Sequence, residues 1–370
     1  MLRVTTVLGT RPEIIRMSSC IKLFDQVFQH RVIHTGQNFD SNLSSVFFQD
    51  LDLRQPDKTL ESKAKSFGAF ISELFPKIEI EFEANRPDAV VILGDTNTAL
   101  ASIVAKRMRI PVYHLEAGNR SFDQNVPEEI NRKIVDHTAD FNLAYTEHGR
   151  INLIREGLHP RTISVIGSPL REVINSQKSK IDESQILQKL QISKDGFILV
   201  SAHRQENIDD PVRLKNLLDA LKKVLADFGL PIVISTHPRL RDKLSNISIE
   251  FPNGFTFCEP FGFSDYLRLQ VDAKVVISDS GSVSEESAIL GFKALTIRNS
   301  IERPEAIEAG TVILAGIDAL DVESAVRFTL KVDSHTSIPA DYLIGDTSIR
   351  VAKFIQSTLP QFHFWSGIRK

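Results

Sequence analysis

The stretch Val4-Thr5-Thr6-Val7-Leu8-Gly9-Thr10-Arg11-Pro12-Glu13 sets a β-branched apolar run directly before a turn and the start of a helix. Gly9 permits a tight turn, Pro12 suits a first helical turn, and Thr10 or Arg11 lies near the N-cap. Free N–H groups at such a helix start attract anions, and Arg11 adds a guanidinium suited to phosphate. An ordinary capped turn with a solvated arginine is the alternative.

The same alternation of apolar run and helical pattern recurs along the whole chain. The runs are 4–8, 31–35, 89–93, 111–115, 141–145, 163–166, 197–201, 232–235, 255–258, 275–278, 295–297 and 312–315. Near-continuous apolar strands between helices indicate parallel sheets covered on both faces. Two sets of about six strands predict an α/β protein with two doubly wound parallel-sheet domains.

The predicted domain boundary follows the Gly167-Ser168-Pro169 segment, before polar helical material. It gives an N-terminal domain over residues 1–170 and a C-terminal domain over 171–345. Residues 346–370 form a last helix and an aromatic tail, which we expect to pack back on the N-terminal domain.

Composition excludes several classes of protein. With 44 Lys+Arg against 47 Asp+Glu the net charge is -3, which disfavours nucleic acid as a partner. Cys20 and Cys258 lie far apart, so neither a disulfide framework nor a cysteine zinc site is expected. No apolar run approaches about 20 residues, and no signal-peptide pattern follows Met1. We therefore expect a cytoplasmic protein with no membrane partner.

Polar segments rich in glycine, histidine, arginine and acid follow many of these runs. They are 9–13, 36–38, 94–96, 116–118, 203–204, 237–239 and 279–282. Ligands of open α/β sheets bind beyond the carboxyl ends of the strands, so these segments predict one ligand cleft. For any single segment, contact with solvent explains the polarity equally well.

Asp95, Glu116 and Glu128 are the candidate acid/base groups. Carboxylates that converge in a partly dry cleft repel one another, so one of them tends to hold a proton. The alternatives are that Asp95 caps the next helix and that Glu128 decorates a first helical turn. Arg16 lies one turn beyond Pro12 and points either to the cleft or into water.

The second half of the chain carries candidate anion-binding groups. Ser280-Gly281-Ser282 has the pattern of a helix N-terminus that could hold a diphosphate, with Glu286 placed to bind a ribose diol. His203 and Arg204 end one strand, and the segment 237–239 ends the next. A serine-capped helix and a structural histidine are the alternatives.

Motifs of other enzyme classes are absent. The chain has no G-x-G-x-x-G, Walker A, H-E-x-x-H or G-x-S-x-G pattern, and no acidic metal-binding spacing. This disfavours dehydrogenases, P-loop ATPases, zinc proteases and α/β-hydrolases, and we expect no metal and no cofactor.

In combination, the motifs resemble the non-hydrolysing UDP-N-acetylglucosamine 2-epimerase family from Val4 to about Gly316. The segments that carry the resemblance are GTRPE (9–13), GDT (94–96), EAG (116–118), PEEINR (127–132), DSG (279–281) and ERPE (302–305). The resemblance implies a GT-B fold, with two Rossmann-like domains that close around a UDP-sugar, and a homodimer. It also implies a reaction in which UDP leaves as the C2 proton is removed, and then adds back to a 2-acetamidoglycal.

Segments 36–40, 53–57 and 117–127 further resemble the capsule and O-antigen branch of the family. That branch implies formation of UDP-N-acetyl-L-fucosamine from UDP-2-acetamido-2,6-dideoxy-L-talose. The alternatives are a UDP-N-acetylglucosamine 2-epimerase that makes UDP-N-acetylmannosamine, a GT-B glycosyltransferase, and a regulator that only binds a UDP-sugar.

By the same resemblance, Asp95, Glu116 and Glu128 transfer protons and His203 assists the departing diphosphate. The residues implied to bind UDP or the sugar are Arg11, Arg204, Tyr266, Ser280, Gly281, Ser282, Glu286 and Arg303. The family commonly has lysine where this chain has Arg16, and a guanidinium does not readily give up a proton. We therefore expect an electrostatic role for Arg16. Tyr266 is expected near the uracil.

Overall fold

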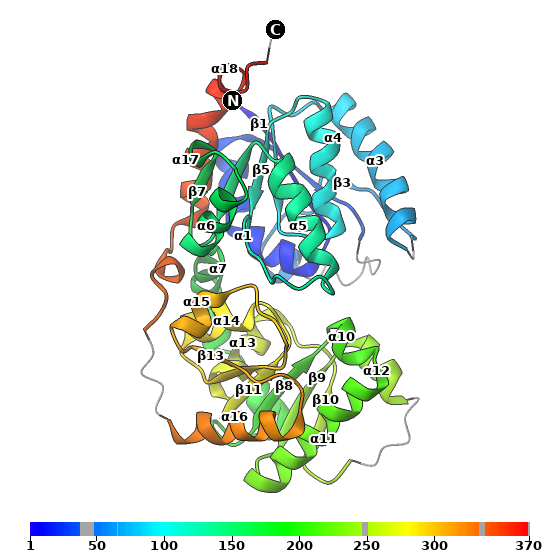
Figure 1. The fold of residues 1–370 in the computed structure, drawn as a ribbon, viewed down its shortest axis with the longest axis vertical. Helices are drawn as coiled ribbons and strands as arrows, with labels where there is room; N and C mark the ends of the chain where they lie inside the picture. Colours follow the sequence, from blue (N-terminus) through cyan, green and yellow to red (C-terminus); the bar gives the residue numbers. More distant parts are fainter. Residues whose placement is uncertain (38–47, 65, 246–250, 333–336, 369–370) are drawn as a thin grey trace. The chain divides into compact units, whose positions relative to one another are not determined.

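The computed structural model describes residues 1–37, 48–64, 66–245, 251–332 and 337–368. Asn38 to Asp40, part of the segment 36–40 singled out above, lie outside the described residues. The chain divides into two compact units, one formed by Met1–Asn175 with Ala340–Lys370 and the other by Ser176–Pro339 (Figure 1). Each unit has one parallel sheet with helices around it, so the predicted α/β class with two doubly wound sheets is confirmed.

The first unit holds a seven-stranded sheet in the order β3-β2-β1-β4-β5-β6-β7. Its strands are β1 (Arg3–Leu8), β2 (Gln29–His34), β3 (Lys58–Thr59), β4 (Ala89–Leu93), β5 (Val112–Leu115), β6 (Phe141–Ala144) and β7 (Ile163–Val165). Its helices are α1 (Arg11–Val27), α3 (Phe67–Ala84), η1 (Asn97–Leu100), α4 (Ala101–Arg107), α5 (Pro127–Thr138), α6 (Glu147–Arg155), η2 (Pro160–Thr162), α7 (Leu170–Ser176), η3 (Ala340–Leu343), α17 (Thr347–Thr358), η4 (Leu359–Gln361) and α18 (Phe362–Trp365).

The second unit holds a six-stranded sheet in the order β10-β9-β8-β11-β12-β13. Its strands are β8 (Ile198–Ala202), β9 (Ile232–Thr236), β10 (Phe255–Cys258), β11 (Val275–Ser278), β12 (Ala294–Thr296) and β13 (Val312–Leu314). Its helices are α8 (Lys178–Asp182), α9 (Ile186–Leu190), α10 (Gln205–Ile208), α11 (Pro211–Phe228), α12 (Pro238–Ser245), α13 (Phe263–Asp272), α14 (Val283–Leu290), α15 (Pro304–Glu308) and α16 (Ala319–Lys331).

The inner strands are buried because helices cover both faces of each sheet. All five residues of β4 are buried, and β11 is buried throughout. Such strands cannot show the alternation of apolar and polar residues seen in half-exposed sheets, which explains the continuous apolar runs of the sequence. In both sheets the order reverses beside the first strand of the unit (β1 or β8), so the polar segments after the central strands gather at one sheet edge.

The C-terminal segment packs within the first unit. Helix α17 lies against α1 (Figure 1), and the Tyr113 hydroxyl of β5 is 2.8 Å from Thr358 Oγ1. In the tail, the centre of the Trp365 ring lies 6.5 Å from the centre of the Phe141 ring. The Arg161 guanidinium lies 4.8 Å from the centre of the Trp365 ring. The aromatic tail is therefore packed on this unit through Phe362 and Trp365.

Among the described residues, no helix combines the length and apolarity needed to cross a membrane.

Candidate active site

The turn between β1 and α1 is shaped by close packing around Gly9. A Cβ at Gly9 would lie 2.1 Å from Thr35 Oγ1 and 2.3 Å from Thr98 Oγ1. Gly9 does not have a positive φ, so the backbone conformation of the turn does not by itself require glycine. Glycine is required here because the two threonine hydroxyls occupy the space of a side chain.

Glu13 ties this turn to the segment that follows β4. Its Oε2 accepts hydrogen bonds from the N–H groups of Gly9 (2.6 Å) and Thr10 (2.8 Å), the latter being the N-cap of α1. Its Oε1 accepts one from the Thr96 hydroxyl at 2.6 Å. Burial raises the pKa of this carboxyl to about 7, although these hydrogen bonds oppose the shift.

Asp95 and Glu116 share one buried cation, Arg132 of α5. Arg132 Nη2 contacts the Asp95 carboxylate and lies 3.5 Å from Glu116 Oε1. Arg132 Nη1 also donates to the Glu116 carbonyl oxygen at 2.7 Å. The positive charge of Arg132 offsets the repulsion between the two carboxylates and holds them close together.

Glu116 has a strained backbone and a second cation. Its φ is +64°, a left-handed value that costs free energy for a residue with a side chain. Arg16 Nη1 lies 3.9 Å from Glu116 Oε2, and the Arg16 guanidinium stands 5.7 Å from the centre of the Tyr145 ring. Arg16 is buried, so the alternative that it points into water is wrong.

Glu128 is exposed in the first turn of α5, whereas its neighbour Glu129 is buried. Glu129 Oε2 accepts from the Ser121 N–H at 2.9 Å and from the Ser121 hydroxyl at 3.0 Å. The structure thus groups Asp95 with Glu116 around Arg132, while Glu128 faces solvent. Arg11 is the first residue of α1 and is half-buried.

A buried charge network lies beneath the Asp95 and Glu116 segments. His114 Nε2 is 2.7 Å from the Gly94 carbonyl oxygen, and His114 Nδ1 is 2.9 Å from Asp136 Oδ1. Asp136 also pairs with Arg120 at 2.7 Å. Burial would raise the pKa of Asp136, but His114 and Arg120 outweigh it and lower the pKa.

In the second unit, Asp279 organises the segment that follows β8. It accepts hydrogen bonds from the N–H groups of His203 (3.0 Å) and Arg204 (3.0 Å), and from Asn207 Nδ2 (3.1 Å). His203 Nδ1 lies 3.0 Å from Asp279 Oδ1. Burial alone would raise the pKa of Asp279, but these partners lower it to about 2.

The segment 280–282 leads into α14 without a side-chain cap. Ser282 holds the N-cap position but its hydroxyl is 2.9 Å from the Ser280 hydroxyl and does not cap the helix, so the alternative of a serine-capped helix is wrong. Glu286, one turn into the helix, accepts from Gln270 Nε2 at 2.6 Å. The Ser280 and Ser282 hydroxyls thus stay beside the helix start, where an anion would bind.

Tyr266 lies partly buried on α13, against the core of the second unit. Its hydroxyl hydrogen-bonds with the side chains of Ser201 and Ser278, and burial, together with the charge of Glu286, raises its pKa. Arg303 is buried and donates to Glu285 Oε1 at 2.5 Å.

Comparison with known proteins identifies the family. The model of the UDP-N-acetylglucosamine 2-epimerase family matches residues 23–356. A protein of Methanocaldococcus jannaschii called UDP-N-acetylglucosamine 2-epimerase is 34% identical over 339 residues, which are 89% of this chain and 92% of that protein. The chain belongs to the UDP-N-acetylglucosamine 2-epimerase family.

Solved structures of this epimerase family agree over the whole fold. A UDP-N-acetylglucosamine 2-epimerase from Rickettsia bellii matches with a TM-score of 0.91 and 38% identity over 98% of both chains. The M. jannaschii enzyme, solved in complex with UDP-GlcNAc and UDP, matches with a TM-score of 0.91 and 32% identity over 96% of this chain and 100% of that one. The fold is therefore GT-B-like, and the chain is an isomerase, a UDP-N-acetyl-sugar 2-epimerase.

This family membership favours an epimerase over the glycosyltransferase and the non-enzymatic regulator that the sequence left open. Among the described residues, no group of three or more His, Cys, Asp or Glu side chains is arranged to hold a metal ion.

Two buried residues of this region, Arg132 and Glu13, were not predicted from the sequence to contact the candidate site segments. Arg132 was visible within the segment 127–132, but nothing in its spacing predicts a contact with Asp95. Glu13 was visible within the segment 9–13, but its bond to Thr96 joins positions 83 apart in the sequence. Both contacts depend on the tertiary fold, so only a signal of long-range pairing could have found them.

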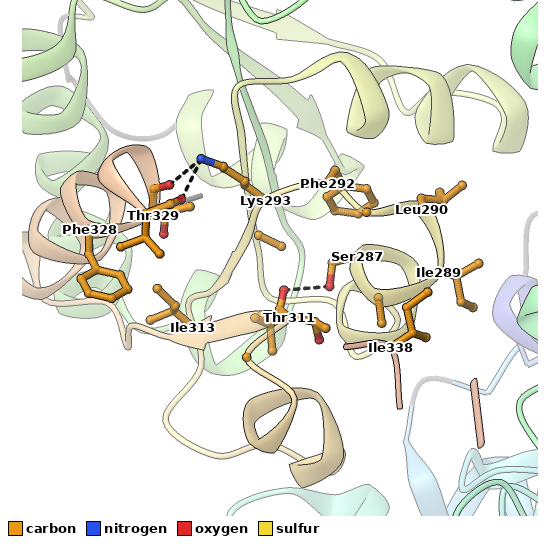
Figure 2. A pocket seen from close by; sticks show the side chains of 16 residues that line it. Ser287, Ile289, Leu290, Phe292, Lys293, Thr311, Ile313, Phe328, Thr329 and Ile338 are labelled. Carbon is orange, nitrogen blue, oxygen red and sulfur yellow. Dashed lines mark hydrogen bonds between the residues drawn. The ribbon is translucent and has the colours of Figure 1, made fainter. Parts of the chain in front are cut away.

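The second unit has an apolar cavity of about 280 Å³ (Figure 2), which is separate from the candidate groups of that unit. It opens at the amino ends of β12 and β13, beside α14 and α16, whereas the candidate groups follow the carboxyl ends of strands. Its one charged side chain, Lys293, donates to the carbonyl oxygens of Thr329 (2.9 Å) and Val332 (3.0 Å). This cavity offers no acid/base group for epimerisation.

Proposed function

We propose that this epimerase interconverts UDP-N-acetylglucosamine and UDP-N-acetylmannosamine. The observation that carries the proposal is the pair Asp95 and Glu116 around the buried Arg132. A reaction that inverts a carbon bearing hydrogen needs groups that remove and return a proton, and paired carboxylates supply them. The names of the relatives with matching sequence and fold support this sugar over the 6-deoxy sugar.

In the proposed reaction, the C2 proton passes to an enzyme base while the bond between C1 and the diphosphate oxygen breaks. The bonding electrons leave with UDP, and a double bond forms between C1 and C2 of the sugar. UDP then adds back to C1 of this 2-acetamidoglycal, and a proton is delivered to the opposite face of C2. The overall balance requires no oxidant and no net proton.

We assign proton transfer to Asp95, Glu116 and Glu128. Ion pairs with Arg132 and Arg16 offset the negative charge that the partly buried Asp95 and the buried Glu116 bring together. Glu128, exposed at the start of α5, is free to approach a substrate without first breaking a buried ion pair. Arg16 acts as a fixed positive charge beside Glu116.

The groups of the second unit are assigned to UDP. Ser280, Gly281 and Ser282 offer hydroxyl and N–H donors at the start of α14 for the diphosphate, with Arg204 and Arg303 as cations. His203, oriented by Asp279 through Nδ1, presents its other ring nitrogen to the leaving group. Arg11, Glu286 and Tyr266 complete the proposed substrate-binding set.

UDP-2-acetamido-2,6-dideoxy-L-talose remains the second candidate substrate. It rests on the segments 36–40, 53–57 and 117–127, of which 38–40 lie outside the described residues. A role in capsule or O-antigen synthesis, like the homodimer, rests on the same resemblance.

Separate incubation of the enzyme with each UDP-sugar, followed by NMR of the anomeric protons, tests the choice. We expect UDP-N-acetylglucosamine to be converted to an equilibrium mixture. Turnover of the 6-deoxy-talose sugar alone would reject the proposed substrate and restore the alternative.

A further inference from the structure

Three guanidinium groups converge on Gly281 in the second unit. A Cβ at Gly281 would lie 3.1 Å from Nη1 of Arg303, and 3.9 Å from both Nη2 of Arg204 and Nη1 of Arg298. The missing side chain lets the guanidinium groups approach this position, two residues before the start of α14. Arg298 directly follows the apolar run 295–297, but it was not among the polar segments predicted to line the ligand cleft.

One buried carboxylate, Glu302, contacts all three of these groups. Its Oε1 lies 3.1 Å from Arg298 Nη2 and 3.6 Å from Arg204 Nη2. Its Oε2 lies 3.9 Å from Arg303 Nη1. Like charges this close repel one another, so Glu302 offsets the repulsion and holds the guanidinium groups in one arrangement.

Positive charge is concentrated at this place. Glu302 and Glu285 are buried carboxylates paired with these arginines, and Glu206, 3.7 Å from Arg204, is exposed. Burial lowers the pKa of Arg298, and the nearby Arg204 lowers it further. An anion bound at Gly281 would favour the charged form of Arg298 and would thus oppose both effects on its pKa.

Arg298 is the least satisfied of the three. Its side chain is 2% exposed, yet its Nε has no hydrogen-bond partner in the described part of the chain. Its Nη2 donates to Glu302, whereas its Nη1 lies 3.9 Å from the place that a Cβ of residue 281 would take. A buried charged donor without a hydrogen bond costs free energy. A ligand oxygen that accepts a hydrogen bond from this guanidinium would recover part of that cost.

We infer that Arg298 binds the diphosphate of UDP directly, as the third cation of a cradle formed with Arg204 and Arg303 and held in place by Glu302. This inference rests on the proposed function, because it takes UDP as the leaving group. When the bond to C1 breaks, its electron pair adds a negative charge to the diphosphate. A third cation therefore binds departed UDP more tightly than it binds the intact UDP-sugar.

Calorimetric titration of the full chain with UDP and with uridine tests this inference. Uridine lacks the phosphates, so it reports whether the rest of the site is intact. For Arg298→Gln we expect UDP to bind about 10- to 100-fold more weakly, and uridine to bind as in the wild type. Arg298→Lys keeps the charge and should recover part of the affinity for UDP.

Arg327→Gln is the matched control, since Arg327 of the same unit is exposed and paired with Glu323. It should bind UDP as the wild type does. The inference is overturned if Arg298→Gln retains wild-type affinity for UDP, or if it loses uridine and UDP equally. A wild type that binds UDP but epimerises no UDP-N-acetylhexosamine would reject the proposed function and leave the assignment of Arg298 standing.

Discussion

The Nε2 atom of His114 lies 2.7 Å from the carbonyl oxygen of Gly94, the residue before Asp95. Gly94 has a φ of +72°, so the chain turns sharply as it leaves β4. Through its other ring nitrogen, His114 contacts Asp136, which also accepts from the N–H of Gly118 at 3.2 Å. One buried carboxylate thus supports the backbone on both sides of the Asp95 and Glu116 pair.

Asp136→Asn should destabilise the first unit strongly. Loss of its charge breaks the fully buried ion pair with Arg120, which retains only the partly exposed Glu156, and weakens the contact with His114; we expect a cost of about 3 kcal/mol. Thermal unfolding measures the effect. Glu147→Gln, which breaks the exposed pair with Arg150, is the control and should cost less than about 1 kcal/mol. Equal melting temperatures for the two variants would show that the network contributes nothing.

Arg132→Lys should lower kcat by about 100-fold. A lysine cannot contact the Asp95 carboxylate, the Glu116 carboxylate and the Glu116 carbonyl oxygen at once. Affinity for UDP should stay unchanged, since Arg132 is not among the groups assigned to UDP. Steady-state kinetics and a UDP titration check both parts. Arg150→Lys, at a partly exposed arginine of the same unit, should leave kcat intact. A variant of Arg132 with normal kcat would remove this residue from the proposed site.

Glu13 should make stability fall as the pH rises. Its pKa is 4.5 when unfolded and about 7 when folded, so the folded state holds a proton that the unfolded state releases. The stabilisation is complete below pH 4.5 and is lost as the pH rises through about 7, a change of about 3 kcal/mol.

Denaturant unfolding of Glu13→Gln tests that pH dependence. Glutamine keeps the shape and an oxygen for Gly9 and Thr10, but does not titrate. The variant should show a smaller loss of stability between pH 5 and 7.5 than the wild type. Identical pH profiles would mean that Glu13 does not titrate in this range.

Trp365→Ala should destabilise the protein by about 2 kcal/mol, because it removes contacts with Phe141 and Arg161. Phe364→Ala is the matched neighbour: Phe364 is 83% exposed, so the change should be within about 0.5 kcal/mol. Differential scanning calorimetry gives both values. If Phe364→Ala proves the more harmful of the two, the packing described for the tail is wrong.

The inner strands could be predicted closely from the sequence. The run 89–93 coincides with β4 because five consecutive apolar residues are buried there. Strand β3 was missed because it consists of two exposed polar residues, Lys58 and Thr59, paired with the end of β2. Its existence depends on the neighbouring strand and not on its own composition.

The candidate site was predictable as a set of strand-end residues but not as a set of contacts. The positions of Asp95 and Glu116 follow from the ends of β4 and β5. Their shared partner Arg132 lies 37 residues from Asp95, on a helix whose rotation no local pattern fixes. Likewise, the approach of Arg298 and Glu302 to Gly281 arises only from the fold, and no local pattern predicts it.

Exchange at C2 in heavy water tests the central claim most directly. The wild-type enzyme is incubated with UDP-N-acetylglucosamine alone in D₂O, and both epimers are examined by NMR and mass spectrometry. Removal and return of the C2 proton by Asp95, Glu116 and Glu128 predicts one deuterium at C2 of UDP-N-acetylmannosamine and, as the reaction reverses, of the starting sugar. Epimers that form with hydrogen retained at C2, or release of UDP without any C2 label, would contradict the account.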